Sequence, residues 1–153
     1  MGDVISTTPI LDGVVIVPLK QIADERGAVL HMLRVDSPLF ENFGEAYFSL
    51  VKPGAVKAWK RHLRMIQNLA VPVGEIDLVI FDDRPESPTR GAVQEITVGS
   101  NCYGLIHIPP RLWYGFRGRG SRDALIANCA SLPHDPEEVE RAPPDHPAIP
   151  YHW

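Results

Sequence analysis

The chain has 153 residues, of which 44% are hydrophobic, and it carries a formal net charge of −4. This length predicts a single domain spanning 1–153, with a core over about 14–130 and a tail over 131–153. The acidic balance argues against general nucleic-acid binding, and no run approaches the roughly 18 apolar residues of a membrane helix. No signal peptide is visible, so we expect a cytoplasmic protein. Two cysteines are too few for a disulfide scaffold.

Short apolar runs, separated by many of the 12 Gly and 15 Pro, follow one another along the chain. They predict strands over 14–18, 28–35, 46–52, 55–65, 68–73, 75–81, 93–98, 105–108 and 121–129. Between them, 40–47 is predicted to be a helical turn or loop, and 82–91 a polar, turn-rich loop in which Arg84 and Ser87 hold the loop. Almost no segment has helical periodicity. The pattern predicts an all-β sandwich or barrel, and a jelly roll suits the number of strands.

The tail differs from the rest of the chain in composition. Residues 133–153 contain six prolines and several acidic side chains, which predicts an exposed, loop-like segment. The tail nevertheless ends in the apolar and aromatic sequence IPYHW. We therefore expect it to pack back on the barrel.

The predicted strand 55–65 has an unusual set of cationic side chains. Strict alternation places Lys60, His62 and Arg64 on one face, and Trp59, Arg61 and Leu63 on the other. Cationic groups are depleted from protein cores and repel one another. In addition, 46–74 contains five basic residues and no acidic one. The segment therefore predicts a wet cavity that holds a small anionic ligand.

The spacing around His62 resembles the first motif of the cupin superfamily. Gly54, His62 and Gly74 fit its frame, but Lys60 and Gln67 stand where a His and a Glu metal ligand are usual. The second cupin motif resembles 104–114, with Tyr114 in place of the last His ligand. The resemblance implies a jelly roll, also called a double-stranded β-helix, that has lost its metal, so we expect no metal and no cofactor.

Further segments resemble two metal-free cupin families that act on sugar nucleotides. DERG at 24–27 and DDRPESPTRG at 82–91 are similar to elements of the dTDP-4-dehydrorhamnose 3,5-epimerase family, which is called RmlC-like. KPGAVKAWKRHLRMIQ at 52–67 is similar to the pattern of sugar-nucleotide 3,4-ketoisomerases. Both families isomerise a 4-keto-6-deoxy sugar linked to a nucleoside diphosphate, by removing a proton next to the ketone.

The resemblance implies a role for each candidate site residue. His62 is the expected base, oriented by a carboxylate for which Asp145 is the nearest match. Lys60 and Arg64 are candidates to stabilise the enolate oxygen. The diphosphate is expected to contact Arg26, Lys57 and Arg61. Gln67 is expected to contact the substrate, and Trp113 to form a wall of the cavity or to stack on a ring.

The proton donor departs from the family pattern. Aligning LIANCAS with the last strand puts Ala127 where the epimerases have a tyrosine, and Tyr114 is the proposed replacement. The substrate, the stereochemical outcome and the choice between epimerisation and a keto shift stay open.

Three functions are therefore weighed. The first is a sugar-nucleotide isomerase or epimerase. The second is a cupin that binds a sugar nucleotide or another small anion without turnover. The third is a metal-dependent cupin such as a dioxygenase, against which Lys60, Gln67 and Tyr114 argue. The resemblance also implies a homodimer in which 14–35 crosses to the neighbour, with no nucleic-acid or membrane partner.

Overall fold

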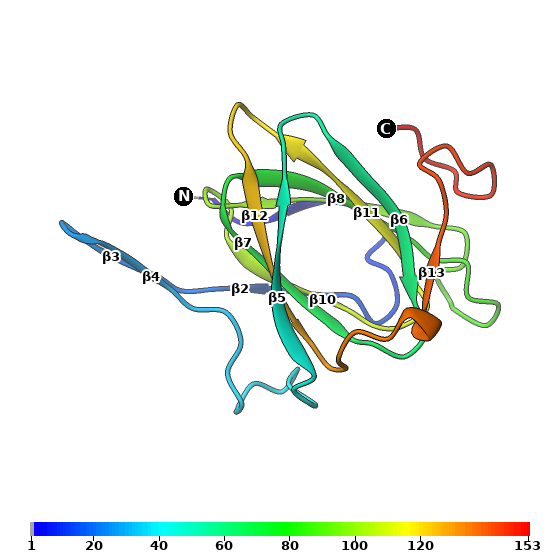
Figure 1. The fold of residues 1–153 in the computed structure, drawn as a ribbon, viewed down its shortest axis with the longest axis horizontal. Coiled ribbons are helices and arrows are strands. Elements are labelled where there is room, and N and C mark those ends of the chain that lie inside the picture. The colour runs from blue at the N-terminus through cyan, green and yellow to red at the C-terminus, as the bar shows by residue number, and fades with distance from the viewer. Residues whose placement is uncertain (1) are drawn as a thin grey trace.

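The computed structural model describes residues 2–153, and nearly all of its regular structure is antiparallel β-sheet (Figure 1). A six-stranded sheet has the order β1 (Ile5–Ser6), β9 (Val93–Gly99), β8 (Glu75–Phe81), β11 (Trp113–Arg119), β6 (Val56–His62) and β13 (Val139–Arg141). A five-stranded sheet has the order β2 (Val15–Pro18), β10 (Gly104–Ile108), β7 (Gln67–Val73), β12 (Ala124–Ala130) and β5 (Glu45–Val51). A separate hairpin consists of β3 (Gln21–Asp24) and β4 (Gly27–Leu30). The prediction of an all-β protein is confirmed.

The two sheets bury an apolar core between them. On β8, Leu78 and Ile80 face this core, while Val79 and Phe81 belong to a second cluster on the other face of the same strand. This alternation is the period of two that a strand imposes on its side chains. β7 and β8 are joined through Gly74, whose φ of +76° and close approach to the backbone of Ala124 exclude a larger residue.

Several elements differ from those predicted. β11 was not predicted to be a strand. Gly115 and Gly118 interrupt its apolar run, so the sequence marked it only as the segment that follows two prolines. β1, β3 and β13 were not predicted, since each is short and polar enough to be read as a loop. β4 ends at Leu30 instead of residue 35. The six-stranded sheet thus gains an edge strand from each side of the predicted core at 14–130.

The tail packs against the outer face of the six-stranded sheet. Ile149, Tyr151 and Trp153 surround Trp59, which is 1% exposed, and the ring centroids of Trp59 and Trp153 lie 5.1 Å apart. Gly115 makes this contact possible, because a Cβ there would lie 2.5 Å from Ala58 and 3.0 Å from Trp153. In Figure 1 the tail runs along the barrel beside β6.

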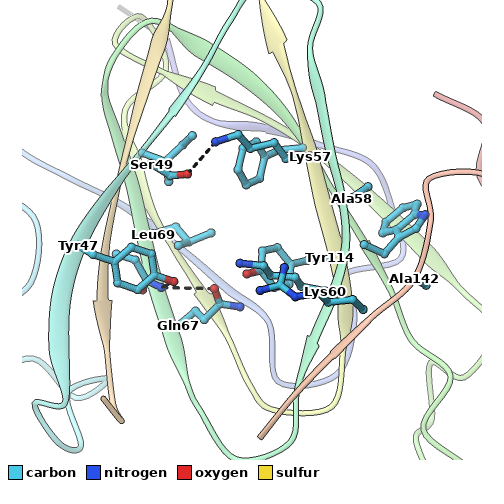
Figure 2. A pocket seen from close by; sticks show the side chains of 14 residues that line it. Tyr47, Ser49, Lys57, Ala58, Lys60, Gln67, Leu69, Tyr114 and Ala142 are labelled. Atoms are coloured by element: carbon cyan, nitrogen blue, oxygen red, sulfur yellow. Dashed lines mark hydrogen bonds between the residues drawn. The ribbon is translucent and has the colours of Figure 1, made fainter. Parts of the chain in front are cut away.

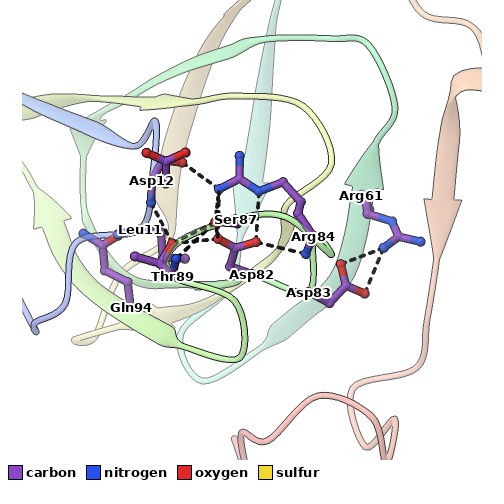
Figure 3. Close-up of polar contacts among 9 residues, drawn as sticks. All are labelled: Leu11, Asp12, Arg61, Asp82, Asp83, Arg84, Ser87, Thr89 and Gln94. Atoms are coloured by element: carbon purple, nitrogen blue, oxygen red, sulfur yellow. Dashed lines mark hydrogen bonds and ion pairs between the residues drawn. The ribbon is translucent and has the colours of Figure 1, made fainter.

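The loop after β8 is held by one buried carboxylate (Figure 3). Asp82 accepts hydrogen bonds from the Arg84 guanidinium at 2.8 and 2.9 Å, and from the hydroxyls of Ser87 and Thr89 at 2.5 and 2.7 Å. Arg84 also donates to the carbonyl of Asp12 at 2.7 Å. Arg84 and Ser87 hold the loop, as the sequence predicted. No helix in the described part of the chain is long and apolar enough to cross a membrane.

Candidate active site

A cavity of about 420 Å³ opens between the two sheets (Figure 2). Side chains from β5, β7 and β12 line it on one side, and side chains from β6 and β11 on the other. The tail closes part of it with Arg141 and Ala142. A jelly roll places its ligand site in this position, between the sheets and inside the barrel mouth.

A β-bulge in β6 determines which cationic side chains enter the cavity. Across the β6–β11 pair, Tyr114 lies opposite Lys60 but Phe116 lies opposite Lys57, so β6 has one extra residue there. Residues three apart point to opposite faces of a regular strand. Because the bulge shifts the alternation by one residue, Lys57 and Lys60 both line the cavity.

Three cations line the cavity without a carboxylate among the lining residues. Lys57 Nζ donates to the carbonyl of Leu50 at 2.6 Å and to Ser49 Oγ at 3.4 Å, both neutral acceptors. Within residues 2–153, no ion pair forms at Lys57, Lys60 or Arg141. Burial, followed by the charges of Arg141 and Lys57, lowers the pKa of Lys60. An anion in this cavity would relieve the mutual repulsion of the three groups.

His62 lies beside the cavity, on the same wall as Tyr114. The two rings are nearly parallel, at 18°, with centroids 6.1 Å apart. His62 Nδ1 is hydrogen-bonded to Glu138 Oε1, and the two side chains are 7% and 2% exposed. His62 Nε2 is buried and has no hydrogen-bond partner among the described residues. The pair, here called the His62–Glu138 dyad, therefore leaves one imidazole nitrogen available as a base.

The electrostatics of the dyad keep His62 neutral and Glu138 ionised. Burial lowers the pKa of His62, and Lys60 and Arg141 lower it further, while Glu138 partly opposes them. Burial alone would raise the pKa of Glu138, but hydrogen bonds from His62 and from the backbone amides of Arg64 and Met65 outweigh it and lower that pKa. A neutral imidazole oriented by a carboxylate is the arrangement that general-base catalysis requires.

The identity of this carboxylate corrects the prediction for Asp145. Asp145 lies in an exposed turn of the tail. β13 pairs with β6 so that Val139 lies opposite His62, which brings Glu138 to the imidazole. Glu138 also ends a short 3₁₀ turn whose N-cap is Asp135, and this turn aims the carboxylate inward. The orienting acid is thus seven residues earlier than predicted.

Arg64 does not share the face of Lys60 and His62, contrary to the prediction. β6 ends at His62, and the chain bends at the next two residues, so the strand alternation does not continue to Arg64. The Arg64 side chain is exposed and donates to Asp135 at 3.4 Å.

Arg61 and Trp113 lie on the outer face of the sheet and away from the cavity. The Arg61 guanidinium pairs with Asp83 and Glu140, each at 2.9 Å, and lies 4.5 Å from the centroid of the Trp113 ring. Trp113 donates its indole N–H to Asp83 at 3.1 Å and packs in the cluster around Trp59. The predictions of a diphosphate contact for Arg61 and of a cavity wall for Trp113 are therefore wrong.

Of the other predicted contacts, Lys57, Lys60, Gln67 and Tyr114 line the cavity together. Arg26 does not. It lies at the tip of the β3–β4 hairpin, its side chain is 83% exposed, and it pairs with Asp24 at 2.7 Å. Figure 1 shows this hairpin extending away from the barrel.

The sequence did not indicate four residues of the site. Tyr47 and Asn128 line the cavity, Arg141 supplies its third cation, and Glu138 completes the dyad. Ala127, aligned with the family tyrosine, is not among the lining residues, whereas its neighbours Ile126 and Asn128 are. Alternation along LIANCAS was the available signal, since it puts Ile126 and Asn128 on one face and Ala127 on the other.

The cavity does not have the donor set of a metal cupin. Across residues 2–153, no group of three His, Cys, Asp or Glu side chains is arranged to hold a metal ion. Lys60, Gln67 and Tyr114 occupy the cavity wall at positions that the cupin motifs assign to ligands. A protonated amine, an amide and a buried phenol fit a divalent cation poorly.

Comparisons with known proteins agree with this geometry. No protein-family model matches the chain. A probable low-salt glycan biosynthesis epimerase from Haloferax volcanii is 36% identical over 135 residues, covering 87% of this chain and 83% of that protein. The crystal structure of a dTDP sugar isomerase from Desulfovibrio desulfuricans G20 is 51% identical, covers 95% of both chains and superposes with a TM-score of 0.92.

A more distant structure shows that the fold is shared more widely. The 4-keto-6-deoxy sugar epimerase from the novobiocin gene cluster of Streptomyces spheroides is 21% identical, with a TM-score of 0.84 over all of this chain and 81% of that one. The likeness confirms the jelly roll of the cupin type. Together with the two closer relatives, it leads to one conclusion: the chain belongs to the RmlC-like family of sugar-nucleotide epimerases and isomerases.

Proposed function

We propose that the chain is an epimerase or isomerase of a nucleoside-diphosphate-linked 4-keto-6-deoxy sugar. The observation that carries the proposal is a cavity with three cations and no lining carboxylate, beside the His62–Glu138 dyad with its neutral imidazole. The cations suit a diphosphate, and the dyad suits removal of a carbon-bound proton next to a ketone. Relatives named as dTDP sugar isomerase and 4-keto-6-deoxy sugar epimerase support this substrate class.

In the proposed reaction, His62 Nε2 takes a proton from the carbon next to the ketone, and the electron pair of the C–H bond moves to the ketone oxygen. Lys60 stabilises that oxygen as an enolate, because a cation in a buried site interacts strongly with developing negative charge. Lys57 and Arg141 hold the diphosphate. Returning a proton to carbon completes an isomerisation that needs no redox cofactor.

Deuterium wash-in tests the proposal. The protein is incubated with dTDP-4-keto-6-deoxyglucose in D2O, and C3 and C5 are followed by NMR and mass spectrometry. His62→Asn is the variant, because its amide can still donate to Glu138, and His152→Asn on the exposed tail is the control. We expect the wild type and the control to incorporate deuterium into the sugar, and His62→Asn to lose this exchange. Saturable binding without any exchange would favour a binding module instead.

We also propose that the chain works as a homodimer in which the β3–β4 hairpin reaches the neighbouring copy. Ile22 and Val29 are 56% and 60% exposed and lie opposite each other on this hairpin, so together they form an exposed apolar pair. Such a crossing gives Arg26 access to the partner's cavity, where it would meet the diphosphate. The cytoplasmic location of the protein stays a prediction.

A further inference from the structure

The cavity has chemically different groups on its two walls. Lys60 and Tyr114 project from the six-stranded sheet, which also holds His62 on β6. Tyr47 projects from β5, the edge strand of the five-stranded sheet. Figure 2 shows the Tyr47 hydroxyl on the opposite side of the cavity from Tyr114 and Lys60. A sugar ring held between the sheets would therefore turn one face to His62 and the other to Tyr47.

Hydrogen bonds determine which role the Tyr47 hydroxyl takes. Asn128 Oδ1 accepts from the backbone N–H of Asn68 at 3.2 Å, which fixes the orientation of the Asn128 amide. Its Nδ2 group therefore donates, to Tyr47 Oη at 2.9 Å and to Gln67 Oε1 at 3.4 Å. Because Tyr47 Oη accepts this bond, its own proton stays free to be donated into the cavity.

Inverting a carbon requires a proton to leave one face of the ring and another to arrive on the opposite face. We propose that Tyr47 is the group that returns the proton, on the face opposite His62. The Tyr47 O–H bond breaks, the enolate electron pair forms the new C–H bond, and the ketone is restored. Tyr47 is left as a phenolate that regains a proton from water, and His62 releases its proton to water. The inference rests on the function proposed above.

The surroundings of Tyr47 suit this role. Burial raises the pKa of its phenol, so the donor form is present at neutral pH, while the bond from Asn128 stabilises the phenolate that donation leaves behind. Tyr114 is placed differently. It lies in the same sheet as His62, its ring is stacked on the imidazole, and burial raises its pKa strongly. Tyr114 therefore faces the ring from the side of the base.

The test compares Tyr47→Phe with Tyr151→Phe, a control that loses one hydroxyl from the outer cluster around Trp59, away from the cavity. Both variants and the wild type are incubated with dTDP-4-keto-6-deoxyglucose in D2O. NMR reports deuterium in unchanged substrate separately from product with an inverted carbon. Thermal unfolding and dTDP binding establish that each variant is folded and binds the nucleotide. General acids contribute about 10²–10⁴-fold to rates, which sets the expected loss.

We expect Tyr47→Phe to retain His62-dependent exchange into the substrate and to form inverted product at least about 100-fold more slowly. Tyr151→Phe should form inverted product at the rate of the wild type. Inverted product from Tyr47→Phe at the wild-type rate would overturn the inference alone. Loss of exchange together with product, in a folded variant that binds dTDP, would also overturn it, because Tyr47 would then be required for the first step. A wild type without exchange would overturn the proposed function itself, and this inference with it.

Discussion

One buried carboxylate determines which nitrogen of His62 can act. Glu138 accepts a hydrogen bond from Nδ1–H, so the lone pair of the neutral ring lies on Nε2. The second oxygen of Glu138 accepts from the backbone amides of Arg64 and Met65, which ties its position to the bend after β6. The geometry of the base thus depends on two segments, the end of β6 and the 3₁₀ turn that precedes β13.

Replacing Glu138 by Gln should lower kcat by about 10²–10⁴-fold with little change in KM. The amide has a single oxygen, so either His62 Nδ1 or the two backbone amides lose their acceptor. Steady-state kinetics on the sugar nucleotide would measure the effect. Glu140→Gln is the matched control, since Glu140 lies only two residues later, on β13, and pairs with Arg61 on the outer face. An unchanged kcat in Glu138→Gln would contradict the role of the dyad.

The pH dependence should report His62 directly. Only the neutral imidazole is a base, so kcat/KM should fall as pH drops through the His62 pKa. Because burial lowers that pKa, and Lys60 lowers it further, the acidic limb should lie below the ordinary value of about 6.5. Lys60→Met removes one of the lowering charges, and we expect the limb to move to higher pH.

Lys52→Met is the control for this measurement, because Lys52 is exposed and outside the cavity. Its pH profile should coincide with that of the wild type. The assignment of the acidic limb to His62 would be contradicted if that limb moved to lower pH in Lys60→Met, or if it moved equally in both variants.

At the scale of elements, the loop after β8 depends on the ionised form of Asp82. Burial alone would raise the pKa of Asp82, but the bonds from Arg84, Ser87 and Thr89 outweigh it and hold that pKa well below its usual range. A carboxylate with a lowered pKa stabilises the folded state above its unfolded pKa of about 4, and this contribution is lost as pH falls. The stabilisation that Asp82 contributes should therefore decline as pH falls below about 4.

Asp82→Asn should lower the free energy of unfolding by about 3 kcal/mol at pH 7, because it leaves the Arg84 charge partly buried without its partner. Urea denaturation would measure the loss, and the difference from the wild type should shrink between about pH 5 and pH 3. Glu86→Gln, an exposed change in the same loop, is the control. A constant difference across this pH range would argue against the role of the charge.

The sequence predicted the elements well where local patterning decides them. The strands around β5 to β10 follow from alternating apolar runs, and His62 was found from the spacing of glycines around it. Pairing between strands that are distant in the sequence determines the remaining features of the site. The bulge that brings Lys57 and Lys60 to one face exists only in the register of β6 with β11. Glu138 lies 76 residues from His62, and only the β13–β6 pairing joins them. Neither feature has a local signature.

At the scale of the whole molecule, exposed apolar side chains support the proposed homodimer. Among them are Ile22 and Val29 on the β3–β4 hairpin and Phe48 on β5, which is 69% exposed. We expect the wild type to sediment as a dimer. The double variant Ile22→Asp and Val29→Asp should sediment as a monomer, because two charges would be buried against the partner.

Ile5→Asp is the control for this experiment. Ile5 is 67% exposed on β1, at the far edge of the six-stranded sheet, and the variant should remain dimeric. A hairpin variant that sediments like the wild type would contradict the proposal that the β3–β4 hairpin crosses to the neighbouring copy. It would also remove Arg26 as a contact of the partner's diphosphate.

The positions of Glu138, just before β13, and of Arg141, at its end, have a consequence for the order in which a working molecule arises. Every strand from β1 to β12 leaves the ribosome before these two residues do. The sheets can therefore pair and bury their core while the imidazole still has no acceptor and the cavity lacks its third cation. Catalytic competence during synthesis should follow closure of the barrel as a separate, later event, set by the docking of β13 beside β6.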